Sequence, residues 1–179
     1  MSRIELTDPD RITDERAETL AQVKGAFGLV PNMFKAVANS PAALRSMWAQ
    51  FGALGQGTLG GKIGELIAVA VADRNRCDYC LSAHTLLGKK AGATAEELSN
   101  AQSGESDDPR TAAVLTLATT LVEKRGQIAD SDVRAARDAG LTQEEIVETV
   151  AHVALNVFTN YINVALDVPV DFTGVALTR

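Results

Sequence analysis

The chain has 179 residues, 46% of them hydrophobic and 22% charged, which is typical of one folded domain and excludes a largely disordered protein. With 23 acidic against 17 basic residues, the net charge of −6 argues against a nucleic-acid-binding protein. The longest apolar run, residues 66–72, is far shorter than the ~20 residues of a membrane span. The first residues also lack the basic start and apolar stretch of a signal peptide. We therefore expect a single cytoplasmic domain over residues 1–179 that contacts neither membrane nor nucleic acid.

Helical periodicity runs through nearly the whole chain, and no stretch alternates between apolar and polar residues as a strand does. The pattern predicts an all-α fold. Pro at first helical positions and Gly after last ones mark many of the helix ends. In chain order we expect helices over residues 13–27, 32–38, 41–54, 62–73, 77–91, 94–102, 109–124, 131–139 and 142–165.

Three of these helices have a recognisable start. Thr13 is the expected cap of the first, while Thr94–Glu97 and Thr142–Glu145 both have the Thr-x-x-Glu sequence of a capping box. The C-terminal tail, Asp167–Arg179, contains Pro and Gly and is expected to wrap the protein's surface or a partner.

Glu65 is surrounded by apolar residues in the fourth predicted helix. Burial of an unpaired carboxylate is costly, so a buried Glu65 needs a hydrogen-bonding partner or a raised pKa. The alternative is a carboxylate on the one solvent-facing stripe near the start of the helix.

The two cysteines form a single Cys77-Asp-Tyr-Cys80 unit directly before a helical pattern. A sulfur in the first turn of a helix is close to the positive end of the helix dipole, which favours the thiolate. The alternative is a pair of buried structural cysteines, although cysteines that flank a polar Asp-Tyr pair are poor core material. A redox-active pair is the favoured interpretation.

His84 follows Cys80 by four residues, so a helix places both on one face. Cys77, Cys80, His84 and Glu65 could together be zinc ligands, but structural zinc sites usually take two paired cysteine knuckles and this chain has one pair. We therefore expect no metal, and a thiol site assisted by an acid and a base.

A polar stripe lies along the apolar last helix. His152, Asn156, Asn160 and Asn163 recur at spacings of four, four and three. Polar groups on such a helix need partners, and a stripe without Lys or Glu is a poor solvent face. The stripe is expected to line the active site or a subunit interface, and the apolar helix and tail make a homo-oligomer the expected state.

The sequence Glu65-(11 residues)-Cys77-Asp-Tyr-Cys80-Leu-Ser-Ala-His84 resembles the signature of the AhpD-like superfamily, which comprises alkyl hydroperoxidase D and carboxymuconolactone decarboxylase relatives. Val30-Pro-Asn-Met-Phe34 with Ser40-Pro41 is similar to the opening of its peroxidase-related branch. Residues 139–142 and 152–161 are similar to the later helices of decarboxylase-type members, so the resemblance covers roughly residues 25–170.

This resemblance implies an oligomer-forming all-α bundle, as a dimer, trimer or hexamer, with thiol-dependent hydroperoxide reductase activity. It implies that Cys80 is the peroxidatic thiol, that Cys77 supplies a proton and then resolves the oxidised sulfur as a disulfide, and that Glu65 and His84 relay protons. No bound cofactor is implied. An external dithiol, a lipoyl or thioredoxin-like protein, would reduce the disulfide.

One position departs from the family pattern. Well-studied hydroperoxidase D members have a second His directly before the second Cys, where this chain has Tyr79, which is expected to line the site or an interface as the polar stripe does. Decarboxylases proper lack the Cys pair. Two alternatives stay open: a decarboxylase or isomerase that uses His84, Glu65 and His152 as acid and base, and a non-catalytic, redox-sensing oligomeric module.

Overall fold

The structure is a computed structural model that describes residues 2–178; Met1 and Arg179, the ends of the expected domain and tail, lie outside the described residues. The described chain is all-helical, which confirms the predicted fold class. Every predicted helix is present within three residues of its expected ends. The elements are η1 (Pro9–Arg11), α1 (Arg16–Phe27), α2 (Asn32–Val37), α3 (Pro41–Leu54), α4 (Gly60–Arg74), α5 (Asp78–Lys90), α6 (Ala95–Ser103), α7 (Pro109–Glu123), α8 (Asp130–Asp138) and α9 (Gln143–Leu166).

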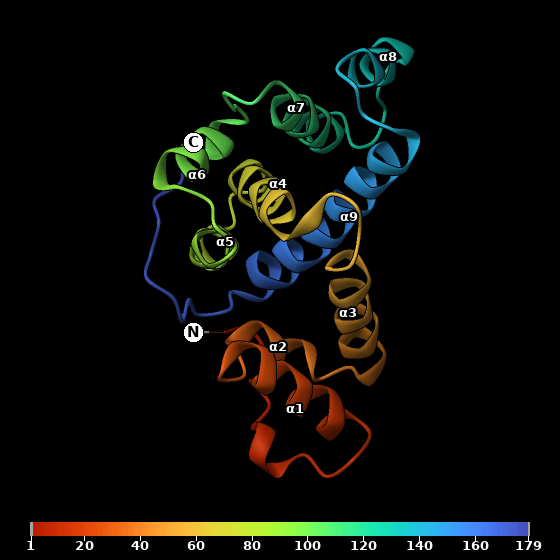
Figure 1. The fold of residues 1–179 in the computed structure, drawn as a ribbon. Helices are drawn as coiled ribbons and strands as arrows, with labels where there is room; N and C mark the ends of the chain where they lie inside the picture. Colours follow the sequence, from red (N-terminus) through yellow and green to blue (C-terminus); the bar gives the residue numbers. More distant parts are fainter. Residues whose placement is uncertain (1, 179) are drawn as a thin grey trace.

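Helix α4 lies at the centre of the molecule, packed against α5, α6, α7 and α9 (Figure 1). Its residues 66–73 are all buried, and most of them are alanine or valine. A helix that is apolar on all sides needs neighbours on all sides, which explains its position. The long helix α9 crosses the molecule, and α2 and α3 pack on it. Helix α1 packs on α3.

Among the described residues, a side chain caps the start of α3, α5, α6, α7 and α9, while α1, α2, α4 and α8 begin without such a cap. Both predicted capping boxes, at Thr94 and Thr142, are formed. The predicted cap Thr13 is wrong, because α1 begins at Arg16 without a side-chain cap. Asp14 instead accepts hydrogen bonds from the backbone N–H of Arg16 at 3.0 Å and from its guanidinium Nε at 2.8 Å, which closes a separate turn before the helix.

Helix α4 begins two residues before its predicted start at residue 62, since Gly60 and Gly61 already belong to it, and a short connector rich in glycine joins α3 to α4. The connector is tied to α9 by the carboxylate of Glu148. This carboxylate accepts hydrogen bonds from the backbone N–H groups of Thr58, at 2.9 Å, and Leu59, at 3.0 Å.

After α9 the tail runs along the surface of its own chain, past α5 to α6 (Figure 1). We call residues 167–178 the C-terminal strap. Phe172, Val175 and Leu177 are partly buried and pack against the core. The expectation that the tail wraps the protein's surface is therefore met within one chain.

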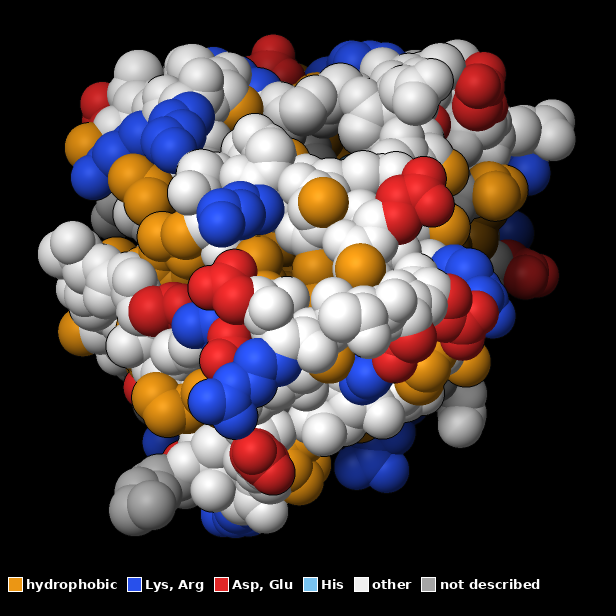
Figure 2. Space-filling model, turned by 90° about the horizontal axis from the view of Figure 1, so that it is seen from below, with side chains coloured by type: hydrophobic (Ala, Val, Ile, Leu, Met, Phe, Trp, Pro, Cys, Tyr) orange, Lys and Arg blue, Asp and Glu red, His pale blue; other side chains and the backbone are white. Residues whose placement is uncertain are grey.

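On the face seen in Figure 2, acidic and basic side chains are interspersed with exposed hydrophobic ones, and no large area carries a single sign of charge. Among residues 2–178, every helix is too short or too polar to cross a membrane.

Candidate active site around Cys77 and Cys80

The two cysteines occupy the N-terminus of α5. Cys77 is the N-cap, and its Sγ accepts a hydrogen bond from the backbone N–H of Cys80 at 3.3 Å. Cys80 lies in the first helical turn. Its sulfur therefore lies near the positive end of the helix dipole, as the sequence predicted.

Both sulfurs are unbonded and buried, with residue exposures of 0% for Cys77 and 2% for Cys80. The sequence argued against burial because Asp78 and Tyr79 separate the two cysteines. Tyr79 is buried too, because its hydroxyl accepts a hydrogen bond from the backbone N–H of Met33 at 3.1 Å. Burial holds the phenol neutral by raising the pKa of Tyr79. Tyr79 and both cysteines therefore lie inside, while Asp78 between them is exposed.

The two thiols differ in acidity. Burial acts to raise the pKa of Cys80, but the hydrogen bond from Cys77, the positive charge of His84 and the amide of Asn163 outweigh it and lower this pKa from 9.0 to about 7. The Asn163 amide nitrogen lies 3.1 Å from the Cys80 sulfur. The pKa of Cys77 is raised by its hydrogen bond to Cys80 and by burial. Of the two thiols, Cys80 is therefore the more acidic, and Cys77 keeps its proton to higher pH.

Glu65 and His84 form a second pair beside the thiols. Nδ1 of His84 lies 2.7 Å from Oε2 of Glu65, between α5 and α4. Burial acts to lower the pKa of His84, but the charge of Glu65 and its hydrogen bond outweigh this and raise it. The partner that a buried Glu65 requires is therefore His84, and a fully solvent-facing carboxylate is ruled out. His84 and Cys80 line the same pocket one helical turn apart.

The polar stripe of α9 is buried along its whole length. Its C-terminal half lies at the thiols: Asn163 donates to Cys80, and Asn160 accepts a hydrogen bond from the Asn75 amide at 2.8 Å. Asn156 donates to the backbone oxygen of His152 at 2.9 Å. The stripe was predicted without a specific role for Asn163; only its spacing along the helix indicates that it shares a face with Asn160.

His152 and Asn156 line a second cavity, which Glu65 and His84 also line from the other side. Burial lowers the pKa of His152, so its imidazole is neutral. The ring lies close to the main chain of α4: a Cβ added at Gly64 would lie 2.9 Å from Cε1 of His152.

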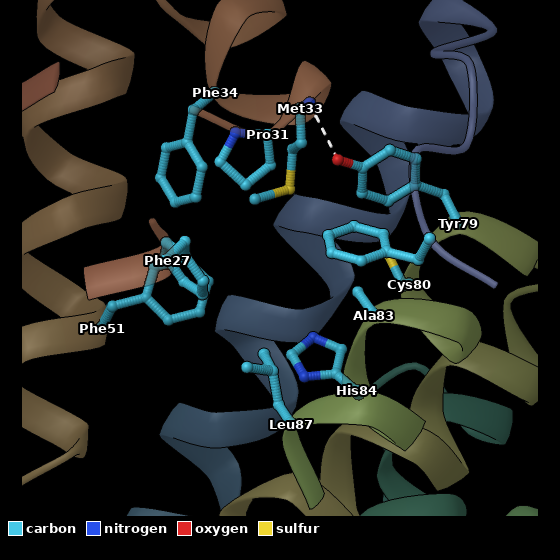
Figure 3. A pocket seen from close by; sticks show the side chains of 11 residues that line it. Phe27, Pro31, Met33, Phe34, Phe51, Tyr79, Cys80, Ala83, His84 and Leu87 are labelled. Atoms are coloured by element: carbon cyan, nitrogen blue, oxygen red, sulfur yellow. Dashed lines mark hydrogen bonds between the residues drawn. The ribbon is translucent and has the colours of Figure 1, made fainter. Parts of the chain in front are cut away.

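The pocket in front of Cys80 is mostly apolar (Figure 3). The space between its walls, open solvent at the mouth included, is about 380 Å³, and only a small part of it is enclosed. In Figure 3, Cys80 and His84 project from α5 towards aromatic rings carried by the N-terminal helices. The lining residues are Phe27, Pro31, Met33, Phe34, Phe51, Tyr79, Cys80, Ala83, His84, Leu87 and Phe172. The sequence pointed to Tyr79 as a possible wall residue but not to the phenylalanines, because Phe27, Phe34 and Phe51 look like core residues of their helices and Phe172 lies in the tail.

Zinc was the alternative for the same side chains. Within the described residues, no group of three or more Cys, His, Asp and Glu side chains is arranged to hold a metal ion.

Comparison with solved structures shows the same fold. A peroxidase-related protein from Silicibacter sp. TM1040 is 23% identical with a TM-score of 0.82, over 98% of this chain and 92% of the other. One with an alkylhydroperoxidase AhpD core, from Ralstonia eutropha JMP134, is 23% identical with a TM-score of 0.85, over 95% and 92%. The debrominase Bmp8, bound to 2,3,4-tribromopyrrole, is 16% identical with a TM-score of 0.80, over 96% and 94%. None of the curated proteins compared with the chain matches it.

The family comparison is more specific. The model of the carboxymuconolactone decarboxylase family matches residues 41–105 and, separately, residues 102–171. The two matches cover α3 to α9, which carry Glu65, both cysteines, His84 and the polar stripe. The chain therefore belongs to the carboxymuconolactone decarboxylase family.

Proposed function

We propose that the protein is a thiol-dependent hydroperoxide reductase. The observation that carries the proposal is the placement of the Cys80 sulfur, 3.1 Å from the Asn163 amide nitrogen and in one pocket with His84. These surroundings lower the pKa of Cys80 to about 7, whereas the hydrogen bond to Cys80 and burial raise the pKa of Cys77. A nucleophile and its resolving partner need this difference, because one must be a thiolate before attack and the other must hold its proton until later.

In the first step, the Cys80 thiolate attacks the terminal oxygen of the hydroperoxide. An S–O bond forms, the O–O bond breaks, Cys80 becomes a sulfenic acid and the substrate leaves as an alkoxide. His84 carries a proton that Glu65 stabilises at 2.7 Å, and this proton neutralises the alkoxide to the alcohol. The Asn163 amide donates a hydrogen bond to the Cys80 sulfur and keeps it in position as the sulfur changes from thiolate to sulfenic acid.

In the second step, Cys77 attacks the sulfenic sulfur of Cys80. A disulfide forms, and the hydroxyl group leaves as water after taking the Cys77 proton. An external dithiol, a lipoyl or thioredoxin-like protein, then reduces the disulfide by thiol–disulfide exchange and is itself oxidised. The cycle needs no bound cofactor.

We also propose that the protein works as a homo-oligomer, a dimer, trimer or hexamer. Helix α9 exposes Val147, Val150, Tyr161 and Val164, each at least 43% accessible in the single chain. Light scattering at micromolar concentration tests this, and a monomer would contradict it.

The decisive experiment is a thiol titration of the fully reduced protein before and after one equivalent of cumene hydroperoxide, with Cys80→Ser as the control. Rapid loss of both thiols, absent in the variant, is the expected result. Two thiols still free after minutes would overturn the proposal and favour a decarboxylase or isomerase that works through His84, Glu65 and His152. Slow oxidation with a changed assembly state would favour a redox sensor.

A halogenated aromatic is a second oxidant for the same titration, because phenylalanines surround Cys80 and the similarly folded debrominase binds a brominated pyrrole. Cys80 would take up the halogen as the ring gains a proton, and Cys77 would displace halide to form the disulfide. Loss of both thiols with free halide in solution, but not with peroxide, would favour dehalogenation.

A further inference from the structure

The C-terminal strap, residues 167–178, forms part of the pocket wall in front of Cys80. Phe172 lines that pocket, although it lies 92 residues beyond the thiol in the sequence. Its ring meets the ring of Tyr79 edge-on, with centroids 5.5 Å apart and planes at 85°. Tyr79 directly precedes Cys80, so the strap's aromatic side chain packs on the segment that carries the reacting sulfur.

The strap is attached to α2 immediately before Phe172. The carboxylate of Asp171 accepts a hydrogen bond from the backbone N–H of Asn32 at 2.8 Å, and the Asn32 amide donates to the oxygen of Pro169 at 3.1 Å. Helix α2 also supplies Met33 and Phe34 to the pocket. The attachment therefore fixes Phe172 relative to the opposite wall.

The strap is attached again after Phe172, to α5 and α4. The N–H of Val175 donates to the Ser82 hydroxyl at 3.0 Å. Thr178 donates twice to the buried carboxylate of Asp73, from its N–H at 2.9 Å and from its hydroxyl at 2.5 Å. Because the strap is attached on both sides of Phe172, the ring is already ordered before a substrate binds. Binding therefore loses little free energy to ordering the ring, and a rigid ring can discriminate between substrates by shape.

We propose that Phe172 is a specificity-determining residue, which makes the pocket select hydroperoxides with a bulky apolar group over hydrogen peroxide. This proposal rests on the proposed function. The polar groups that the reaction needs, the Cys80 sulfur and the His84 imidazole, lie on one side of the pocket, while Phe172, Phe34 and Phe51 offer apolar surface. An organic peroxide gains contact with that surface, and hydrogen peroxide has no group to place there.

Steady-state kinetics with cumene hydroperoxide and with hydrogen peroxide test this in the wild type, Phe172→Ala and Phe172→Leu. The ratio of the two kcat/KM values should fall about tenfold in Phe172→Ala, through KM for the organic peroxide, and mostly recover in Phe172→Leu. Val170→Ala is the matched control, since Val170 lies on the same strap and outside the pocket lining. An unchanged or increased ratio in Phe172→Ala, or an equal fall in Val170→Ala, would overturn the proposal.

A second measurement separates this proposal from the proposed function. Alkylation of Cys80 by N-phenylmaleimide and by iodoacetamide, followed by mass spectrometry, reports selection by the pocket without any peroxide chemistry. The preference for the apolar reagent should fall in Phe172→Ala and persist in Val170→Ala. If both variants retain the preference for the apolar reagent, the selective role of Phe172 is wrong. If the wild-type protein discriminates between the two reagents but consumes no peroxide, only the proposed hydroperoxide reductase activity is contradicted.

Discussion

Nδ1 of His84 and Oε2 of Glu65 lie 2.7 Å apart, although the two residues are 19 positions apart and belong to different helices. The Glu65 carboxylate accepts a hydrogen bond from Nδ1 of His84, and this stabilises the protonated imidazole in the pocket that also contains the Cys80 sulfur. It raises the pKa of His84 against the opposing effect of burial, and the resulting positive charge helps to lower the pKa of Cys80. Acidity at the sulfur is therefore set partly by a carboxylate that lines a different cavity.

Replacing Glu65 by Gln should lower the pKa of His84 and thereby raise that of Cys80, because the imidazolium loses its negative partner. Peroxide-driven thiol oxidation at neutral pH should slow by about a hundredfold. Stopped-flow measurement of thiol loss checks the rate. Glu123→Gln is a matched control, since Glu123 is exposed and bonds Arg74 away from the thiols. If the rate of thiol oxidation is the same in Glu65→Gln and in Glu123→Gln, the proposed proton relay through Glu65 is wrong.

The rate of the first step should depend on pH through the Cys80 thiolate. Because the pKa of Cys80 is lowered to about 7, the rate should rise with pH, reach half of its maximum near pH 7 and level off about one unit higher. An ordinary thiol would still be gaining rate towards pH 9.0. Pre-steady-state oxidation across this pH range measures the midpoint, and a midpoint near the ordinary value would contradict the electrostatic account of the site.

Asn163→Leu removes the amide that donates to the Cys80 sulfur and keeps a similar volume. The pKa of Cys80 should rise by about one unit, which lowers the thiolate fraction at pH 7 about fivefold. The pH dependence of Cys80 alkylation measures this directly. Asn156 lies on the same helix, but its amide donates to the backbone oxygen of His152, so Asn156→Ala should leave the thiol pKa unchanged. A shift of equal size in Asn156→Ala would indicate a general disturbance of α9.

Asp73→Asn should lower the free energy of unfolding by about 2 kcal/mol near neutral pH, because the buried carboxylate accepts charge-assisted hydrogen bonds from Thr178 and Gln102. Burial acts to raise the pKa of Asp73, and these hydrogen bonds outweigh it and hold the pKa below 3.8. The carboxylate thus stabilises the fold above that value, and the contribution disappears as the pH falls through the lowered pKa.

Urea unfolding of Asp73→Asn and wild type at several pH values tests this, and the difference should narrow below about pH 4. A difference that stays constant into the acid range would assign the effect to shape rather than to charge. Thr178→Val, which removes one of the donors, should show a smaller loss of the same sign.

The helices, and the placement of Cys77, Cys80 and His84 together on one of them, were predictable because their signals are local. A Thr-x-x-Glu sequence specifies its own capping box, and Cys80 and His84 are joined by one helical turn. Glu65 required more, since its pairing with His84 follows only from the packing of α4 against α5. Its apolar neighbours nevertheless indicated that a partner had to exist.

What the sequence did not disclose depends on tertiary packing. Helix α1 begins three residues later than predicted because Asp14 pairs with Arg16, and this pairing competes with a cap at Thr13. The burial of both sulfurs depends on a hydrogen bond between Tyr79 and α2. Phe172 reaches the pocket only because both flanks of the strap are attached, and those attachments join residues more than 90 positions apart.

Gly64 has a consequence for comparisons among relatives of this chain. A side chain at this position would meet the imidazole of His152 at 2.9 Å, so the ring must turn or be replaced before the position can accept any other residue. The two positions are therefore expected to covary: wherever a homologue carries a methyl or larger group in place of Gly64, the site of His152 should hold a smaller residue. In a homologue that has a larger residue in place of Gly64, the imidazole of His152 would therefore be absent from the cavity that Glu65 lines.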